Sequence, residues 1–263
     1  MKKRTLALAM ASVMALSLAG CGGGDTASTT AAATEAAAEG AETTAQAEAP
    51  AENAEVANKD KPLVWFNRQP SNSSTGELDM AALTFNENTY YVGFDANQGA
   101  ELQGTMILEY IQNNIEGLDR NGDGIIGYVL AVGDIGHNDS IARTRGVRSA
   151  LGTAVEVDGV IDSTPVGTNI DGTSTYVKDG TLEIDGTTYI VRELASQEMK
   201  NSAGATWDAA TAGNAIGTWA SSFGDQIDIV ASNNDGMGMS MFLAWSKAEG
   251  VPTFGYDANS DAV

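Results

Sequence analysis

The sequence is poor in cysteine, histidine and basic side chains. Its 263 residues include one Cys and one His, which excludes an internal disulfide framework and a Cys/His zinc cluster. A Ser-His-Asp or Cys-His enzyme would have to use that single histidine. Lys and Arg number 14 against 35 Asp and Glu, giving a formal net charge of -21. This charge repels phosphates and anionic lipid, so neither nucleic acid nor a membrane surface is expected as a direct partner.

The first 20 residues have the pattern of an export signal. Basic residues at positions 2–4 precede an uncharged, mostly apolar run over 6–18, which is too short for an ordinary membrane-spanning helix. The run ends in Leu18-Ala19-Gly20-Cys21, which resembles the lipobox of bacterial lipoproteins. We therefore predict a signal peptide over 1–20 and lipidation of Cys21, whose acyl chains would hold the protein on the outer face of the bacterial cytoplasmic membrane, or in the periplasm. An ordinary secretory cleavage site beside a stray thiol is the alternative.

The next segment, 21–58, is rich in Ala, Thr and Glu and nearly free of large apolar residues. Such a composition cannot bury enough surface to offset the entropy lost on ordering. We predict a disordered tether that lifts the following domain off the membrane.

Strand-like and helix-like patterns alternate through the rest of the chain. Apolar runs predict strands at 62–66, 90–94, 125–132, 154–161, 227–231 and 252–256, and a polar hairpin over 176–191 with turns at Asp179-Gly180 and Asp185-Gly186. Helical spacing predicts helices around 102–111 and over 140–151, 205–221 and 236–249. Strands separated by single helices favour an α/β fold with doubly wound parallel sheets.

Polar side chains follow several of these strands. Carboxyl ends of parallel strands meet at one edge of a sheet, where such folds bind ligands. Amide, carboxylate, imidazole and guanidinium groups suit a sugar, whose hydroxyls each donate and accept, and Trp207 offers a face for stacking on a pyranose ring. A role as helix caps is equally consistent with the spacing of Asp139, Asn234 and Asp257.

A short acidic motif over 119–124, DRNGDG, fits the first six positions of an EF-hand calcium loop. It has oxygen ligands at positions 1, 3 and 5 and the turn glycine at position 6. Position 12, normally a bidentate Glu, is Leu130, so the closing carboxylate would come from elsewhere in the chain. A surface turn without metal is the alternative.

Seven segments in matching order carry a family resemblance. They are 65–71 (WFNRQPS), 91–93 (YVG), 119–124 (DRNGDG), 136–143 (GHNDSIAR), 207–210 (WDAA), 233–239 (NNDGMGM) and 254–258 (FGYDA). Together they resemble the periplasmic galactose/glucose-binding proteins, the substrate-binding components of sugar ABC importers. The resemblance implies a periplasmic-binding-protein-like fold of two α/β lobes that close over one sugar. It implies D-galactose or D-glucose as ligand, ABC permease membrane subunits and a chemoreceptor as partners, and no catalysis.

The resemblance also assigns roles to single residues. It implies a stacking face at Trp207 and hydrogen-bonding sugar ligands at six positions. Those six are Asn67, His137, Asp139, Arg143, Asn234 and Asp257.

For the metal, the resemblance implies Ca²⁺ held by the loop and closed by a remote carboxylate. The implied ligands are Asp119, Asn121, Asp123, the carbonyl of Ile125, and Asp228. Two departures predict weaker binding. Gly127 stands where the family usually has Gln, and Asp228 stands where it usually has the longer Glu.

The lobes are expected to be unequal. Residues 59–118 resemble only part of the first lobe, which is therefore expected to be incomplete, with exposed apolar sheet faces. Residues 119–263 resemble most of the second lobe, with a hairpin insertion near 174–192. The alternative to a working receptor is a truncated, non-binding fragment that retains calcium binding. An enzyme such as a glycosidase is disfavoured, because the matched order of motifs belongs to a binding protein.

Overall fold

The computed structural model describes residues 61–72 and 76–260. The chain divides into two units, Met1–Ala47 and Glu48–Val263, and all described residues belong to the second. The predicted signal peptide, the whole predicted tether and the lipidation site Cys21 lie outside the described residues. Within the described ranges, no helix is both long enough and apolar enough to cross a membrane.

Two parallel strands, β1 (Leu63–Asn67) and β2 (Thr89–Gly93), form a small sheet of their own. They confirm the first two predicted strands. Trp65 points from β1 to the short helix α2 (Met80–Leu83), where its indole Nε1 donates a hydrogen bond of 3.0 Å to the carbonyl of Ala82.

The other face of this small sheet is apolar and exposed. Val64 and Phe66 of β1 are paired in register with Tyr90 and Val92 of β2, and their exposed fractions run from 51% to 77%. This matches the expectation of exposed apolar sheet faces in the first region.

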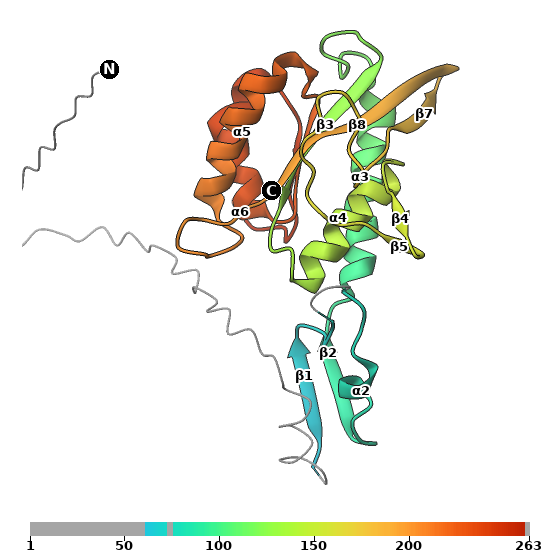
Figure 1. Ribbon diagram of the computed structural model, residues 1–263, viewed down its shortest axis with the longest axis vertical. Helices are drawn as coiled ribbons and strands as arrows, with labels where there is room; N and C mark the ends of the chain where they lie inside the picture. The colour runs from blue at the N-terminus through green and yellow to red at the C-terminus, as the bar shows by residue number, and fades with distance from the viewer. Residues whose placement is uncertain (1–60, 73–75, 261–263) are drawn as a thin grey trace, which may run out of the picture. The chain divides into compact units, whose positions relative to one another are not determined.

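A six-stranded sheet forms the core of the larger part. Its strand order is β10-β9-β3-β8-β6, with β7 also paired to β8 (Figure 1). The strands β10, β9, β3 and β8 are parallel, whereas β6 and β7 run antiparallel to β8. The bounds are β3 (Ile125–Val132), β6 (Gly167–Thr168), β7 (Gly180–Ile184), β8 (Thr187–Glu198), β9 (Ile229–Ser232) and β10 (Thr253–Phe254).

Helices cover both faces of this sheet (Figure 1). The central strand β3 is buried along nearly its whole length because its side chains alternate between two cores. Tyr128 and Leu130 pack with one pair of helices, and Val129 and Ala131 with the other. The first pair is α3 (Ala96–Asn114) and α4 (Asn138–Ala150); the second is α5 (Ala209–Phe223) and α6 (Asp235–Met241). This layering confirms the α/β fold class.

One strand prediction was wrong. Residues 154–161 do not enter the sheet but form two short antiparallel strands, β4 (Glu156–Val157) and β5 (Val160–Ile161). Asp158 and Gly159 between them have φ of 54° and 81°, the positive values that a two-residue hairpin turn requires. The strands that pair with β3 are β8 and β9.

The hairpin prediction was partly correct. Asp185-Gly186 is the turn between β7 and β8. Asp179-Gly180 is not a turn, because Gly180 opens β7. Glycine is needed there for close packing, since a Cβ would overlap the carbonyl oxygen of Leu151.

Two predicted helices differ at their ends. The helix predicted from 205 begins at Ala209, because Asp208 is its N-cap and accepts from the amide of Thr211 at 2.7 Å. The helix predicted over 236–249 is not α-helical throughout, because α6 ends at Met241. It continues as a π-helical turn, η2 (Phe242–Ser246), and ends in α7 (Lys247–Glu249). A 3-10 turn, η1 (Gly224–Gln226), follows α5.

Candidate functional site

The carboxyl ends of β3, β9 and β10 lie side by side because these strands are parallel and in register. Backbone hydrogen bonds continue past the strand ends, from Asn233 to Ala131 and from Asp235 to Tyr256. The residues that follow β3, β9 and β10 are therefore brought to one edge of this sheet.

Arg143 is the centre of this edge. The guanidinium is buried, with 5% of the residue exposed. Its Nη1 donates to the carbonyl of Asn233 at 2.6 Å and lies 3.2 Å from Asp257 Oδ1, and its Nη2 lies 3.7 Å from Asp139 Oδ2. One cation thus joins two carboxylates that follow different strands of the sheet.

Two aromatic rings flank the same guanidinium. The ring of Tyr256 lies 3.7 Å from Arg143 Cζ and that of Trp207 lies 5.6 Å from it. Trp207 also meets His137 edge to face at 5.4 Å. The indole covers Gly133 so closely that a Cβ there would overlap the ring. Trp207 therefore lies beside Arg143 and His137, two of the predicted sugar ligands.

His137 serves as the N-cap of α4. Its Nδ1 accepts from the amide of Asp139 at 3.1 Å, so the neutral ring carries its proton on Nε2. Burial lowers the pKa of His137 from 6.5 to about 4, and the nearby charge of Arg68 contributes. At neutral pH this side chain is an uncharged hydrogen-bond donor.

The capping interpretation also holds for part of the set. Asn234 is the N-cap of α6, and its Oδ1 accepts from Met237 N at 2.9 Å. Asp139 lies in the first turn of α4. Asp257 instead follows β10 and is linked to Arg143. Asn234 and Asp139 therefore have a structural role at helix starts, and Asp139 also belongs to the Arg143 group.

Asn67 stands apart from that group. It ends β1, and its carbonyl accepts from the hydroxyl of Tyr91 at 3.0 Å. Its exposed side chain is not among those that Arg143 joins. Asn67, Trp207 and Asp257 have φ of 65°, 59° and 96°. Such values are costly for residues other than glycine and cluster at functional sites.

The sequence analysis gave no role to two residues that belong to this edge. Tyr256 stacks on Arg143, and Gln103 of α3 donates through Nε2 to the carbonyls of Ser232 and Gly255, at 2.9 and 2.8 Å. Tyr256 precedes Asp257 in a matched segment, which was an available signal. Nothing in the local pattern of α3 marks Gln103.

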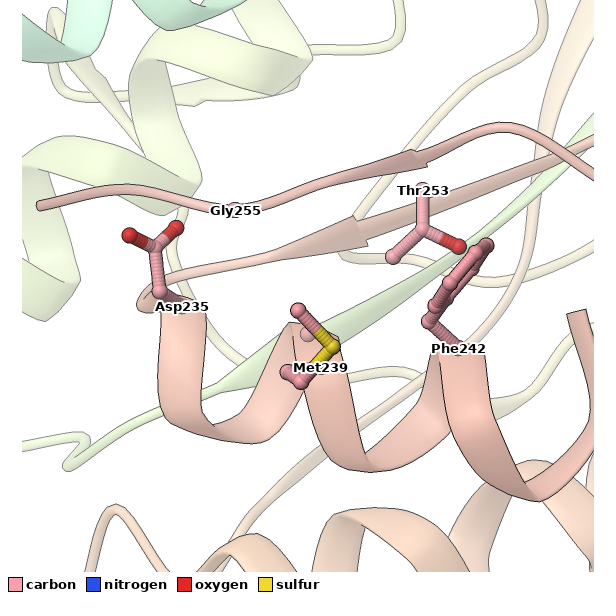
Figure 2. Close-up of a pocket in the computed structure, with 6 residues that line it drawn as sticks. Asp235, Met239, Phe242, Thr253 and Gly255 are labelled. Atoms are coloured by element: carbon pink, nitrogen blue, oxygen red, sulfur yellow. The ribbon is translucent and has the colours of Figure 1, made fainter. Parts of the chain in front are cut away.

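A cavity of about 150 Å³ lies between α6 and the edge strand β10 (Figure 2). Its walls include Met239, Phe242 and Thr253. None of the seven predicted sugar-binding residues lines it. This cavity is therefore separate from the Arg143 group.

The predicted calcium loop forms a compact turn ahead of β3. Asp119 accepts from the amides of residues 122, 123 and 124, and Asp123 accepts from the amide of Ile125. Within the described part of the chain, no group of three or more His, Cys, Asp or Glu side chains converges as a metal site. The loop oxygens themselves are of the hard type that Ca²⁺ prefers.

Asp228 lies against this loop, as the resemblance implied. It is fully buried, and its two oxygens accept from the amides of Arg120 and Gly127 at 3.0 and 2.7 Å. Burial is the main cause that raises the pKa of Asp228 to about 7; the two amide hydrogen bonds oppose this rise, and the charges of Asp119 and Asp123 add to it. A divalent cation would compensate these carboxylates, so the residues fit Ca²⁺ in donor type and charge.

The structure explains the missing ligand at Gly127. A Cβ there would overlap the carbonyl oxygen of Gln226 and the side chain of Leu194. No side chain fits at this position without a shift of η1 and β8. The loop therefore has no substitute for the family's usual Gln.

Three comparisons relate the chain to known proteins. The model of a family described as "Periplasmic binding protein domain" matches residues 54–263. The chain is 28% identical over 225 residues to the D-galactose/methyl-galactoside binding periplasmic protein MglB of Haemophilus influenzae, covering 81% of this chain and 52% of that protein.

Two solved structures are similar at a TM-score of 0.43 each. One is a galactofuranose binding protein, 13% identical, with 76% of this chain and 47% of that chain covered. The other is a protein from Mycobacterium smegmatis in complex with beta-D-fucofuranose, 15% identical, with 76% and 46% covered. The chain spans about half the length of the relatives it matches.

The family match extends over all the described residues. The family is one of extracytoplasmic binding proteins. The chain belongs to the periplasmic binding protein domain family.

Proposed function

We propose that this protein is a lipid-anchored, extracytoplasmic receptor that binds one monosaccharide, D-galactose or D-glucose. The observation that carries the proposal is the buried Arg143, held between Asp139 and Asp257 and flanked by Trp207. The likeness to a relative described as binding D-galactose and methyl-galactoside supports this choice of ligand.

The chemistry of the Arg143 group suits a neutral polyol. Two carboxylates offset the single guanidinium, and His137 is uncharged at neutral pH because its pKa is about 4. Carboxylate oxygens accept from hydroxyls, while guanidinium and imidazole N–H groups donate to them. An indole face adds stacking on apolar C–H groups. None of these groups is placed to act as a nucleophile with an adjacent base, and we infer binding without catalysis.

The same proposal includes partners and a metal. The receptor would deliver sugar to the membrane subunits of an ABC permease and signal through a chemoreceptor. Lipidation of Cys21 would keep it at the membrane. Asp119, Asn121, Asp123, the Ile125 carbonyl and Asp228 would hold a structural Ca²⁺, whose charge would offset the buried carboxylate of Asp228.

Titration calorimetry of the full chain with D-galactose and D-glucose tests the proposal. We expect saturable one-to-one binding, lost in Arg143→Ala. Arg145→Ala is the matched control. Arg145 lies on the same helix but donates to the carbonyl of Ile161 instead, so its loss should leave affinity within about twofold. A folded chain that releases no heat with either sugar would contradict the proposal and favour the non-binding alternative.

A further inference from the structure

Asn233 lies one residue before the predicted sugar ligand Asn234, directly after β9. It is 0% exposed, so it cannot touch a ligand at the sheet edge. Its side-chain amide is nevertheless at the centre of a hydrogen-bond network. That network connects elements which carry the proposed site residues.

The side chain of Asn233 accepts from two different elements. Its Oδ1 accepts from the amide of Gly133, after β3, at 3.1 Å, and from the hydroxyl of Ser140, on α4, at 2.8 Å. The Nδ2 of the same amide has no hydrogen-bond partner among the described residues. The acceptor oxygen therefore carries the function of this side chain.

The backbone of Asn233 holds the guanidinium directly. Its carbonyl accepts from Arg143 Nη1 at 2.6 Å, and its amide donates to Ala131 at 2.9 Å. Because the side chain and the amide fix the orientation of this residue, they also fix where its carbonyl points. The position of Arg143 between Asp139 and Asp257 depends on that carbonyl.

We propose that Asn233 is a positioning residue of the binding site, which aligns Arg143 for the ligand without touching the ligand itself. The inference rests on the proposed function, because Arg143 is its assumed ligand contact. It adds a residue whose effect on affinity acts entirely through Arg143. A buried acceptor that orders a charged side chain in advance reduces the ordering cost of binding.

The test compares three variants of the full chain by calorimetry with D-galactose and by ¹⁵N NMR of arginine side chains. Asn233→Ala removes the acceptor. Asn233→Asp keeps an acceptor oxygen, but it replaces the unpartnered Nδ2 with a second oxygen and adds a negative charge near Arg143. Asn169→Ala is the control for stability: Asn169 is also buried and makes two hydrogen bonds, to the carbonyl of Glu193 and from the amide of Ser174.

We expect Asn233→Ala to weaken galactose binding at least tenfold and to free the rotation of the Arg143 guanidinium. Asn233→Asp should stay within about threefold of the unmodified chain, and Asn169→Ala should lose thermal stability but not affinity. Equal affinity in Asn233→Ala, or an equal loss in Asn169→Ala, would overturn the inference.

The NMR signals keep the two proposals distinguishable. Arg143→Lys assigns the Arg143 resonance. If the unmodified chain binds no sugar, the proposed function fails, yet slow guanidinium rotation that is lost only in Asn233→Ala would still establish the positioning role. Fast rotation in the unmodified chain would refute that role whatever the affinity.

Discussion

At the scale of single residues, His137 combines a helix cap, an aromatic contact and a depressed pKa. The cap requires an unprotonated Nδ1, because that atom accepts from the amide of Asp139. Protonation would place a second N–H against this donor. The ring is therefore held neutral by geometry as well as by burial.

Stability should consequently depend on pH through His137. The pKa is about 4 in the folded chain and near 6.5 in an unfolded one, so the unfolded state takes up the proton first as the pH falls. Above about pH 6.5 this group does not lower the free energy of unfolding. As the pH falls to 4, it lowers that free energy by up to about 3 kcal/mol. Denaturant unfolding at several pH values between 7.5 and 4 measures this loss.

His137→Asn provides the matched control for that titration. Asparagine still caps the helix but does not titrate. The free energy of unfolding of the natural chain should fall relative to that of the variant as the pH drops below 6.5. Parallel pH profiles for the two chains would show that the ring is not held neutral.

That most residues of the Arg143 group lie together could be predicted from the sequence for a physical reason. His137, Asp139 and Arg143 share the start of one helix after β3, and parallel strands bring Asp257 to the same edge. Tyr256 was not predicted as a contact. Tyr256 lies next to Asp257, whose φ is 96°. Residue spacing alone does not reveal such a backbone conformation.

At the scale of elements, α3 and α4 cross with almost no side chains between them. A Cβ on Gly146 of α4 would overlap the carbonyl of Ala100 on α3. This contact presses α4, which carries Arg143, against α3. The contact with α3 therefore helps to hold α4, and with it Arg143, in place.

Gly146→Ala should destabilise the protein by about 1–3 kcal/mol, because the added methyl group has no room. Gly217→Ala is the opposite case. Gly217 lies within α5 and its Cβ would meet nothing within 4 Å, so alanine should add about 0.5–1 kcal/mol. Thermal unfolding of both variants checks the opposite signs, and stabilisation by Gly146→Ala would contradict the close crossing.

Binding of Ca²⁺ at the predicted calcium loop should stabilise the fold. Ca²⁺ at 100 times its dissociation constant should stabilise the fold by about 2.7 kcal/mol, seen as a rise in Tm. Asp228→Asn should reduce that rise, because the closing carboxylate is lost. Asp225→Asn, an exposed aspartate in η1, should leave it unchanged. A Tm that does not change with Ca²⁺ would contradict calcium binding at this loop.

The local sequence pattern predicted some strands correctly and others incorrectly. The run of β3 was recognisable because both faces of that strand are buried. Its pairing partners, β8 and β9, were not predicted from the sequence. Residues 154–161 were predicted as one strand, and the Asp158-Gly159 turn was the overlooked local signal that divides them into β4 and β5.

Across the larger part of the structure, the buried ion pair of Arg148 and Glu193 connects elements that are far apart in the sequence. Arg148 of α4 and Glu193 of β8 are both 0% exposed and lie 2.7 Å apart. Arg148 also donates to the carbonyls of Asp162 and Thr164, and Tyr128 of β3 donates to Glu193 at 2.8 Å. The pair thereby ties a helix, two strands and the segment after β5 together.

Arg148→Met should cost about 3–5 kcal/mol of folding free energy, because it leaves Glu193 buried without compensation. The double variant Arg148→Met/Glu193→Leu should recover part of that loss. Chemical denaturation of the three chains measures both effects. A double variant less stable than Arg148→Met would show that the charge of Glu193 is not the source of the cost.

Binding of a sugar at the edge defined by Arg143 and Trp207 can be followed by tryptophan fluorescence of the full chain during titration with D-galactose. We expect a saturable change in emission that disappears in Trp207→Phe and persists in Trp245→Phe, since Trp245 lies beside Arg120 instead. If a folded chain shows no change, or if the change survives the loss of Trp207, sugar does not bind at this edge.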